Sequence, residues 1–220
     1  MAAPQNYAIV IFPGFQALDA FGPIDALNCL SRRTKINFSI IARTLDPVPT
    51  GSPSPADNPF NSNCSQSIVP THTFDSLPYD GKIDVLLVPG GMGTRHEESI
   101  LPVIDFLGKI YPSLGYLVTV CTGSEVFART GLLDGRRATT NKMRFESVEA
   151  LRPQVEWVRK ARWVVDGNIW TSSGISAGID VTLAFFEKHY GRERALEIAR
   201  VLEYEWHQDA DRDPFYRPAE

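Results

Sequence analysis

The fold class can be inferred by working outward from one stretch, Tyr116-Leu-Val-Thr-Val-Cys-Thr-Gly-Ser124. Its first part, Tyr116–Val120, is a short apolar run, which predicts a strand buried on both faces, as in a parallel sheet. Cys121-Thr-Gly-Ser124 then leads into a helical segment that we expect over Glu125–Leu133, closed by Asp134-Gly135. A strand that runs through a tight turn into a helix is the repeating unit of α/β proteins.

The same alternation of strand and helix recurs along the chain. Tyr7–Phe12, Ile36–Ala42 and Ile83–Val88 predict further buried strands. Between the first two we expect a helix that opens at Pro23, because proline is favoured in a first helical turn. Later elements are expected as a helix over Glu97–Ile110, a hairpin over Trp163–Trp170 that turns at Asp166-Gly167-Asn168, and helices over Ser176–His189 and Arg192–Tyr204. The order predicts right-handed parallel crossovers and a doubly wound sheet.

Length and composition are those of an ordinary globular protein. The 220 residues are 43% hydrophobic and 22% charged, and we expect one domain over residues 1–220. A proline-rich surface loop is expected over residues 45–66 and a surface-wrapping tail over residues 209–220. The formal charge of −4 gives no basic face for nucleic acid. Neither an apolar membrane-spanning run nor a signal peptide is evident, so a cytoplasmic protein is expected.

The three cysteines, Cys29, Cys64 and Cys121, predict different roles. They form no C-x-x-C pair, so neither a disulfide framework nor a metal site is expected. Cys29 lies in a helical pattern and Cys64 in the proline-rich loop, which indicates packing and an incidental thiol. Cys121 lies where a strand turns into a helix, a position resembling a nucleophile elbow, with Gly123 allowing the close turn. The helix N-terminus is expected to lower the pKa of this thiol.

Two further strand ends carry candidate site residues. Asp19 lies in an apolar stretch after the first strand, where it either caps a helix or is held in a site as a proton carrier. Pro89-Gly-Gly-Met-Gly93 follows the expected strand Ile83–Val88, either as a plain turn or as a loop whose N–H groups meet a developing negative charge. No histidine is expected beside Cys121, although His96 could face the pocket, so a Cys-His-acid triad is not evident.

Five collinear motifs carry a resemblance to a known family. They span residues 12 to 180 and resemble the ThiJ/PfpI superfamily, that of the Parkinsonism-associated deglycase and the PfpI intracellular protease. Within it they resemble the isonitrile hydratase branch. The motifs are Phe12-Pro-Gly-Phe-Gln-Ala-Leu-Asp-Ala-Phe-Gly-Pro23, Val88-Pro-Gly-Gly91, Thr119-Val-Cys-Thr-Gly-Ser124, Gly131-Leu-Leu-Asp-Gly-Arg-Arg-Ala-Thr-Thr140 and Gly174-Ile-Ser-Ala-Gly-Ile-Asp180.

The resemblance implies a flavodoxin-like three-layer sandwich with a mainly parallel sheet, as in class I glutamine amidotransferases, and a homodimer. It implies that Cys121 is the nucleophile, Asp19 its acidic partner and Thr122 a positioning residue. It also implies that the substrate- or anion-binding side is formed by Gly90, Gly91, Gly22 and Asn141. Many relatives carry histidine where this chain has Asn141, which counts against a mechanism that needs that histidine as a base.

The resemblance implies hydration of isonitriles to N-substituted formamides, with no metal or organic cofactor and a small-molecule substrate. Two alternatives stay open: a glyoxalase or deglycase that acts on reactive carbonyls, and a non-enzymatic sensor in which Cys121 is oxidised to a sulfinic acid. We expect Phe15, Phe21 and Met92, with side chains from a partner subunit, to shape the pocket for the substrate's substituent.

Overall fold

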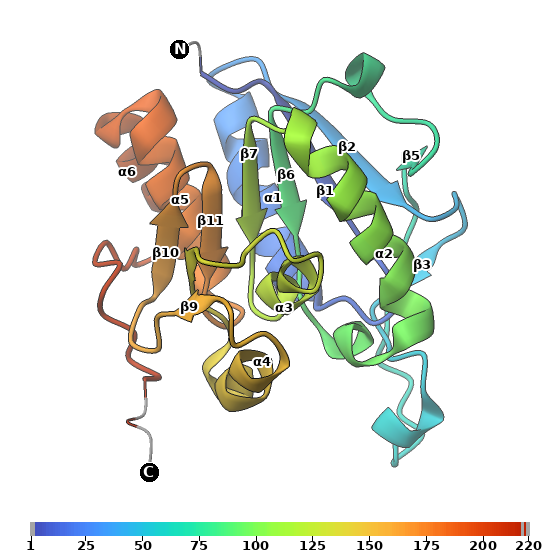
Figure 1. Cartoon of the computed structure of the whole chain (residues 1–220). Helices are drawn as coiled ribbons and strands as arrows, with labels where there is room; N and C mark the ends of the chain where they lie inside the picture. Colours follow the sequence, from blue (N-terminus) through green and yellow to red (C-terminus); the bar gives the residue numbers. More distant parts are fainter. Residues whose placement is uncertain (1–2, 217, 219–220) are drawn as a thin grey trace.

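A seven-stranded sheet forms the centre of the protein in this computed structural model, which describes residues 3–216 and 218 (Figure 1). The strand order is β10-β11-β7-β6-β1-β2-β5, and every neighbouring pair is parallel except β10 with β11. The strands are β1 (Asn6–Val10), β2 (Asn37–Ala42), β5 (His72–Thr73), β6 (Val85–Val88), β7 (Tyr116–Thr119), β10 (Trp163–Asp166) and β11 (Ile169–Ser172).

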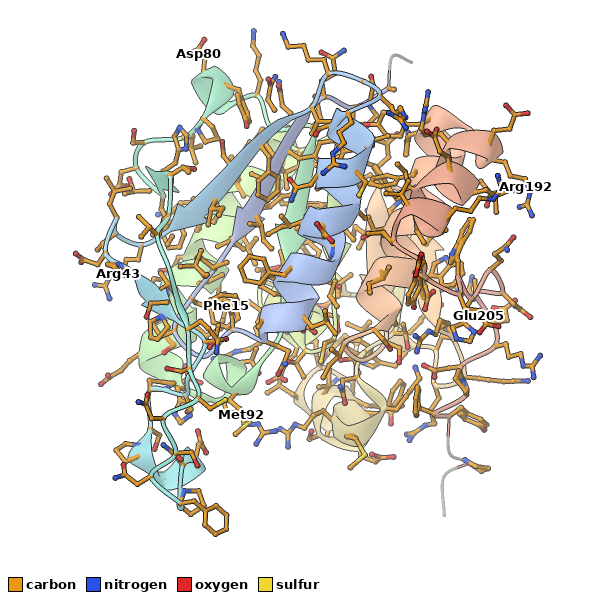
Figure 2. All side chains as sticks on the ribbon, turned by 180° about the vertical axis from the view of Figure 1, so that it is seen from behind. Phe15, Arg43, Asp80, Met92, Arg192 and Glu205 are labelled. Atoms are coloured by element: carbon orange, nitrogen blue, oxygen red, sulfur yellow. The ribbon has the colours of Figure 1, made fainter. Side chains whose placement is uncertain are left out.

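Helices cover both faces of this sheet. On one face α1 (Ala17–Ser31) contacts α5 (Ala177–Tyr190) and α6 (Arg192–Val201), and Figure 2 shows this face toward the viewer. On the other face α2 (Glu97–Ile110) contacts the short α3 (Gly123–Ala128), in front of the sheet in Figure 1. The predicted flavodoxin-like three-layer α/β fold is therefore confirmed. The sequences of the central strands are continuously apolar because both faces of these strands are buried.

Shorter elements complete the chain, and the sequence analysis did not predict most of them. They are β3 (Val48–Pro49), β4 (Ser67–Ile68), β8 (Arg137–Ala138), β9 (Glu156–Trp157), α4 (Phe145–Leu151) and the 3₁₀ turns η1 (Pro55–Asp57), η2 (Tyr79–Gly81), η3 (Met92–Arg95), η4 (Tyr111–Ser113) and η5 (Lys142–Arg144). The surface loop expected over residues 45–66 contains two of these short elements, β3 and η1. Its start pairs with β4 in an antiparallel ladder, and one helical turn lies inside it.

The expected start of the first helix was also wrong. The helix α1 begins at Ala17, and Pro23 lies inside it. Proline in a helix interior removes the hydrogen bond to the carbonyl four residues earlier, here that of Asp19. Burial of the flanking Ala20 and Leu27 in the core offsets that loss, because tertiary packing supplies most of a helix's stability.

Two helices are shorter than expected. The helix α3 ends at Ala128 because the Thr130 hydroxyl donates to the Phe127 carbonyl and Gly131 takes a positive φ of 81°. The helix α6 ends at Val201, and Glu203 adopts a φ of 48°, outside the helical range. The helix over Glu97–Ile110 and the hairpin of β10 and β11 agree with the prediction.

Candidate active site

The carboxyl ends of β1, β6 and β7 lie side by side, because these strands are neighbours in the sheet. The loop after β1 is hydrogen-bonded to the loop after β6, with Gln16 N–H donating to Gly90 O at 2.8 Å and Gly93 N–H to Gly14 O at 2.9 Å. The turn after β7 carries Cys121. The loops that follow these three strands therefore converge at one edge of the sheet.

Cys121 has the strained backbone expected of a nucleophile elbow. Its φ is 57°, a left-handed conformation that non-glycine residues adopt rarely and that is most often found at functional sites. Gly123 is required for the same turn, since a Cβ there would lie 2.1 Å from the Val88 carbonyl oxygen.

Two buried hydroxyl groups and a buried backbone carbonyl hold Cys121 in this conformation. Its N–H donates to Ser173 O at 3.1 Å, and its carbonyl oxygen accepts hydrogen bonds from Ser124 Oγ at 3.1 Å and Thr140 Oγ1 at 3.2 Å. All three partners are almost fully buried. The surrounding fold therefore supplies the constraints that a strained residue needs in order to persist.

Three donors surround the Cys121 sulfur. Asn141 Nδ2 donates to Sγ at 3.1 Å, and the backbone N–H groups of Ile175 and Thr122 also donate to it. Asn141 is itself held in place, because its Oδ1 accepts from Met143 N–H at 2.9 Å. Since each of these hydrogen bonds lowers the pKa of the thiol, the three donors together favour negative charge on sulfur.

The Asp19 carboxyl group lies beside this thiol. Asp19 stands in the first turn of α1 and does not cap it, because the N-cap is Gln16. Its Oδ2 accepts from Gly90 N–H at 2.9 Å, and among the described residues Oδ1 has no partner in hydrogen-bond geometry. Burial raises the pKa of Asp19 to about 7. The Gly90 N–H and the Cys121 thiol each lower this pKa, but by less than burial raises it. Of the two readings left open for Asp19, the geometry therefore favours the site.

The expectation of a lowered thiol pKa was wrong. Burial, together with the nearby Asp19 charge, raises the pKa of Cys121 to about 12. The side chain is only 6% exposed, and α3 has six residues, so removal of the thiolate from water outweighs the field at the helix end. The resting pair is therefore a neutral thiol next to a carboxyl group that titrates near pH 7.

The N–H groups of the glycine loop are already occupied. Gly90 N–H donates to Asp19, and Gly91 N–H donates to Thr122 Oγ1 at 3.0 Å. The Thr94 hydroxyl also reaches Thr122 Oγ1, at 3.4 Å. The loop therefore positions the acid and the threonine, and the donors that face the sulfur come from Asn141 and other backbone groups. A role for these two N–H groups in binding an anion directly is not supported.

Several other candidate residues lie elsewhere. Gly22 is one turn after Asp19, but it faces α5, where a Cβ would lie 2.8 Å from Ile179 Cγ1. His96 Nε2 contacts Asp57 Oδ2 at 2.7 Å, not the thiol. Phe15 lies inside the molecule in Figure 2 and is fully buried.

The sequence analysis missed Thr140, Ser173 and Ile175 as site residues. All three lie within or next to motifs that carried the family resemblance. The available signal was polar residues at the ends of apolar segments, as in Thr139-Thr140 and Ser172-Ser173. Ile175 also has a left-handed backbone, with a φ of 40°, which no residue pattern predicts.

Neither a metal centre nor a membrane span is found in residues 3–216 and 218. No group of three or more His, Cys, Asp or Glu side chains is placed to bind a metal ion there. No helix in these ranges combines the length and the apolar character needed to cross a membrane.

Proteins with similar sequences include an enzyme, a transcriptional regulator and a DJ-1 homologue. The isonitrile hydratase of Pseudomonas putida is 33% identical over 196 residues, which cover 89% of this chain and 76% of the relative. The HTH-type transcriptional regulator CdhR of Pseudomonas aeruginosa is 26% identical over 89% of this chain, which spans 54% of that regulator. Protein DJ-1 homolog A of Arabidopsis thaliana is 31% identical, and the match covers 29% of its length.

Solved structures and a family profile agree with these relatives. A THiJ/PfpI family protein from Pseudomonas syringae superposes with a TM-score of 0.75 at 27% identity, covering 98% of this chain and 78% of that one. DJ-1beta of Drosophila melanogaster superposes with a TM-score of 0.72 at 20% identity over 94% of this chain and 100% of that one, which shows the shared fold. The DJ-1/PfpI family profile matches residues 6–188, and the chain therefore belongs to the DJ-1/PfpI family.

Proposed function

We propose that this protein is a hydro-lyase that hydrates isonitriles, R–N≡C, to N-substituted formamides with Cys121 as nucleophile. The observation that carries the proposal is the buried pair of Cys121 and Asp19, whose carboxyl pKa is raised to about 7 while three donors face the sulfur. The similarity to the Pseudomonas putida isonitrile hydratase supports it.

The first step adds the thiol across the terminal carbon of the isonitrile. The Asp19 carboxylate accepts the thiol proton while the sulfur attacks the carbon, and it then gives that proton to the same carbon. The product is a thioimidate, R–N=CH–S–Cys121, with no leaving group released. Because the thiol has a high pKa, the proton leaves sulfur only as the new bond forms.

The second step adds water to the thioimidate. Asp19, again a carboxylate, takes a proton from a water molecule that attacks the thioimidate carbon, and the proton passes to nitrogen. The resulting R–NH–CH(OH)–S–Cys121 breaks at the C–S bond. The hydroxyl proton returns to sulfur, so the formamide R–NH–CHO leaves and the thiol is restored.

The donors around the sulfur stabilise the negative charge that develops on it in both steps. Asn141 Nδ2 and the Ile175 and Thr122 N–H groups are fixed before substrate arrives, so no reorganisation is needed during the reaction. Thr122 contributes to positioning through its hydroxyl, which accepts from Gly91 N–H. An amide at position 141 donates a hydrogen bond but does not act as a base at neutral pH.

The test is formamide production from cyclohexyl isocyanide, followed by NMR, with intact-protein mass spectrometry to trap the thioimidate on Cys121. We expect Cys121→Ala to abolish turnover and adduct, and Asp19→Asn to reduce turnover strongly. Cys64→Ala, which changes an exposed loop thiol, is the matched control and should turn over normally. Turnover that survives in Cys121→Ala would refute the mechanism.

Two other roles are outcomes of the same assay. Turnover of methylglyoxal without turnover of an isocyanide would indicate a deglycase or glyoxalase, although Asn141 supplies no general base for that chemistry. A thiol that oxidises but turns over neither substrate would indicate a sensor of the kind found in the regulators that share this family.

A homodimer, implied by the family resemblance, is also part of the proposal. The exposed apolar side chains Leu18 and Phe21 lie on α1, the helix that carries Asp19. Size-exclusion chromatography with light scattering tests this, and a Leu18→Asp variant should lower the apparent mass to that of a monomer.

A further inference from the structure

A cavity of about 560 Å³ lies against the residues that hold the thiol. Its size is in the range of small-molecule binding pockets. Three segments and Arg159 line it: residues 141–143 with 145 and 146 near the start of α4, residues 173–176 before α5, and residues 214–216 near the C-terminus. It is separate from the groove over α1 that Phe21 and Gly22 line.

The inner wall of the cavity contacts Cys121 directly. Asn141 donates to the sulfur at 3.1 Å, Ile175 donates through its N–H group, and Ser173 O accepts from the Cys121 N–H. These three residues are all part of the cavity lining. Cys121 itself is not part of the lining, so the cavity lies one residue away from its sulfur, beyond Asn141 and Ile175.

The charged side chains of the lining are neutralised by one another or turned away. Arg159 pairs with Glu146 and Glu149 and stacks 4.4 Å above the Phe145 ring. Lys142 Nζ donates to Thr139 Oγ1 at 2.8 Å and to the Ala161 carbonyl at 2.7 Å. Because its ammonium group is engaged there, Lys142 lines the cavity with its methylene groups.

The remaining wall groups are mostly apolar or aromatic, with Asn141, Ser173 and Ser176 as the polar ones. The apolar and aromatic ones are Phe145, Ile175, Met143, Pro214, Phe215 and Tyr216. Lys142 and Arg159 are the cations that the described residues contribute to this lining, and both are engaged, so neither is left free to pair with an anionic ligand. The chemistry of the walls therefore suits an uncharged, apolar group.

A buried carboxylate holds the C-terminal wall in place. The Asp213 side chain is fully buried, with Oδ1 3.7 Å from Arg162 Nη1 and Oδ2 3.8 Å from Lys142 Nζ. Its Oδ1 also accepts from Phe215 N–H at 2.9 Å, and its carbonyl accepts from Tyr216 N–H at 3.1 Å. The backbone of the two aromatic residues is therefore fixed by a turn that is hydrogen-bonded to Asp213.

We propose that this cavity receives the substituent on the isonitrile nitrogen, and that Phe215 and Tyr216 select bulky, uncharged alicyclic or aromatic substituents. The inference rests on the proposed hydration of isonitriles. It replaces the pocket of Phe15, Phe21 and Met92 expected from the sequence, since none of those residues lines this cavity.

The first test compares kcat/KM for cyclohexyl isocyanide, methyl isocyanide and the anion isocyanoacetate in the wild type and in a Phe215→Ala/Tyr216→Ala variant. We expect the wild type to prefer the cyclohexyl compound. The variant should lose on the order of tenfold for it, mainly in KM, while methyl isocyanide is unaffected. Phe60→Ala, an exposed aromatic in the 45–66 loop, is the matched control. Equal effects on all three substrates, or a preference for isocyanoacetate, would overturn the proposal.

A second test separates this inference from the proposed function. In a Cys64→Ala background, Cys121 is alkylated with N-cyclohexyl-2-iodoacetamide or with 2-iodoacetamide, each forming an S–C bond with loss of iodide. Intact-protein mass spectrometry gives the alkylation rate with each reagent. The same two reactions with glutathione give the ratio of rates for a thiol without a pocket. We expect the ratio at Cys121 to exceed that of glutathione and to fall in the Phe215→Ala/Tyr216→Ala variant. If the protein hydrates no isonitrile but Cys121 still shows this selectivity, the inference about the cavity stands and the proposed function is refuted. A ratio equal to that of glutathione refutes the pocket.

Discussion

Replacing Asp19 with asparagine is expected to stabilise the fold at alkaline pH while it removes the proton carrier of the proposed mechanism. The Asp19 carboxyl is almost fully buried, and burial raises its pKa from 3.8 to about 7. Folding therefore opposes its ionisation. Asparagine has the same shape, its Oδ1 can still accept from Gly90 N–H, and it carries no charge that must be removed from water.

The magnitude follows from proton linkage. Between pH 3.8 and about 7 the folded protein binds more protons at Asp19 than the unfolded chain does, so the free energy of unfolding falls as the pH rises through this window. Each tenfold difference in proton affinity is worth about 1.4 kcal/mol, which gives about 4 kcal/mol at pH 8 for the full difference. Asp19→Asn removes this loss, and it should leave stability near that of the wild type at pH 4.

The measurement is urea unfolding of wild type and Asp19→Asn at pH 4, 6 and 8. The difference in unfolding free energy between the two proteins isolates Asp19 from other titrating groups. We expect the difference to grow with pH, in favour of the variant, over the window in which Asp19 ionises. Asp25→Asn, at an exposed position on the same helix, is the control for removal of a carboxyl group from the surface. A difference that does not change with pH, or that favours the wild type at pH 8, would refute the account of Asp19 as a buried, destabilising charge.

Three further predictions concern the same site. The logarithm of kcat/KM for isonitrile hydration should rise with unit slope up to about pH 7 and then level off, because the Asp19 carboxylate is needed as base; a rate that falls through pH 7 would contradict this role. Asn141→Asp keeps the acceptor that orders its turn but removes the donor to the Cys121 sulfur, so turnover should fall about tenfold or more and alkylation by iodoacetamide should slow, as checked by kinetics and intact mass. Gly123→Ala should destabilise the fold by at least about 3 kcal/mol in urea unfolding, since its Cβ meets a carbonyl oxygen at 2.1 Å, whereas Gly108→Ala, with open space on the helix α2, should gain about 1 kcal/mol; similar values for both variants would argue against the elbow geometry.

Local sequence patterns predicted those parts of the fold that depend on neighbouring residues. The apolar runs before Pro13, Pro89 and Cys121 indicated central strands, and all three end at the same edge of the sheet. The start of α1 was mispredicted because the preference of Pro23 for a first turn is local, whereas burial of the preceding residues is not.

The candidate site divides in the same way. Cys121 was indicated by its place between a strand and a helix, and Asp19 by an acidic side chain in an apolar stretch. That Asn141 and Ile175 face the sulfur could not be inferred from spacing, because they come from segments 20 and more residues farther along the chain. The aromatic pair Phe215 and Tyr216 came to line a cavity only through the buried Asp213.

The sequence by itself determined the layered α/β fold and the place of Cys121 at a strand end, because periodicity and strand-end position are properties of short segments. The pairing of Cys121 with Asp19 came only from the family resemblance. The tertiary structure decided the charge state of that thiol. A helix start next to Cys121 suggested a lowered pKa, but the pKa is raised to about 12. The physical reason is that desolvation sums over every group packed around the sulfur, and only the complete fold shows which groups those are.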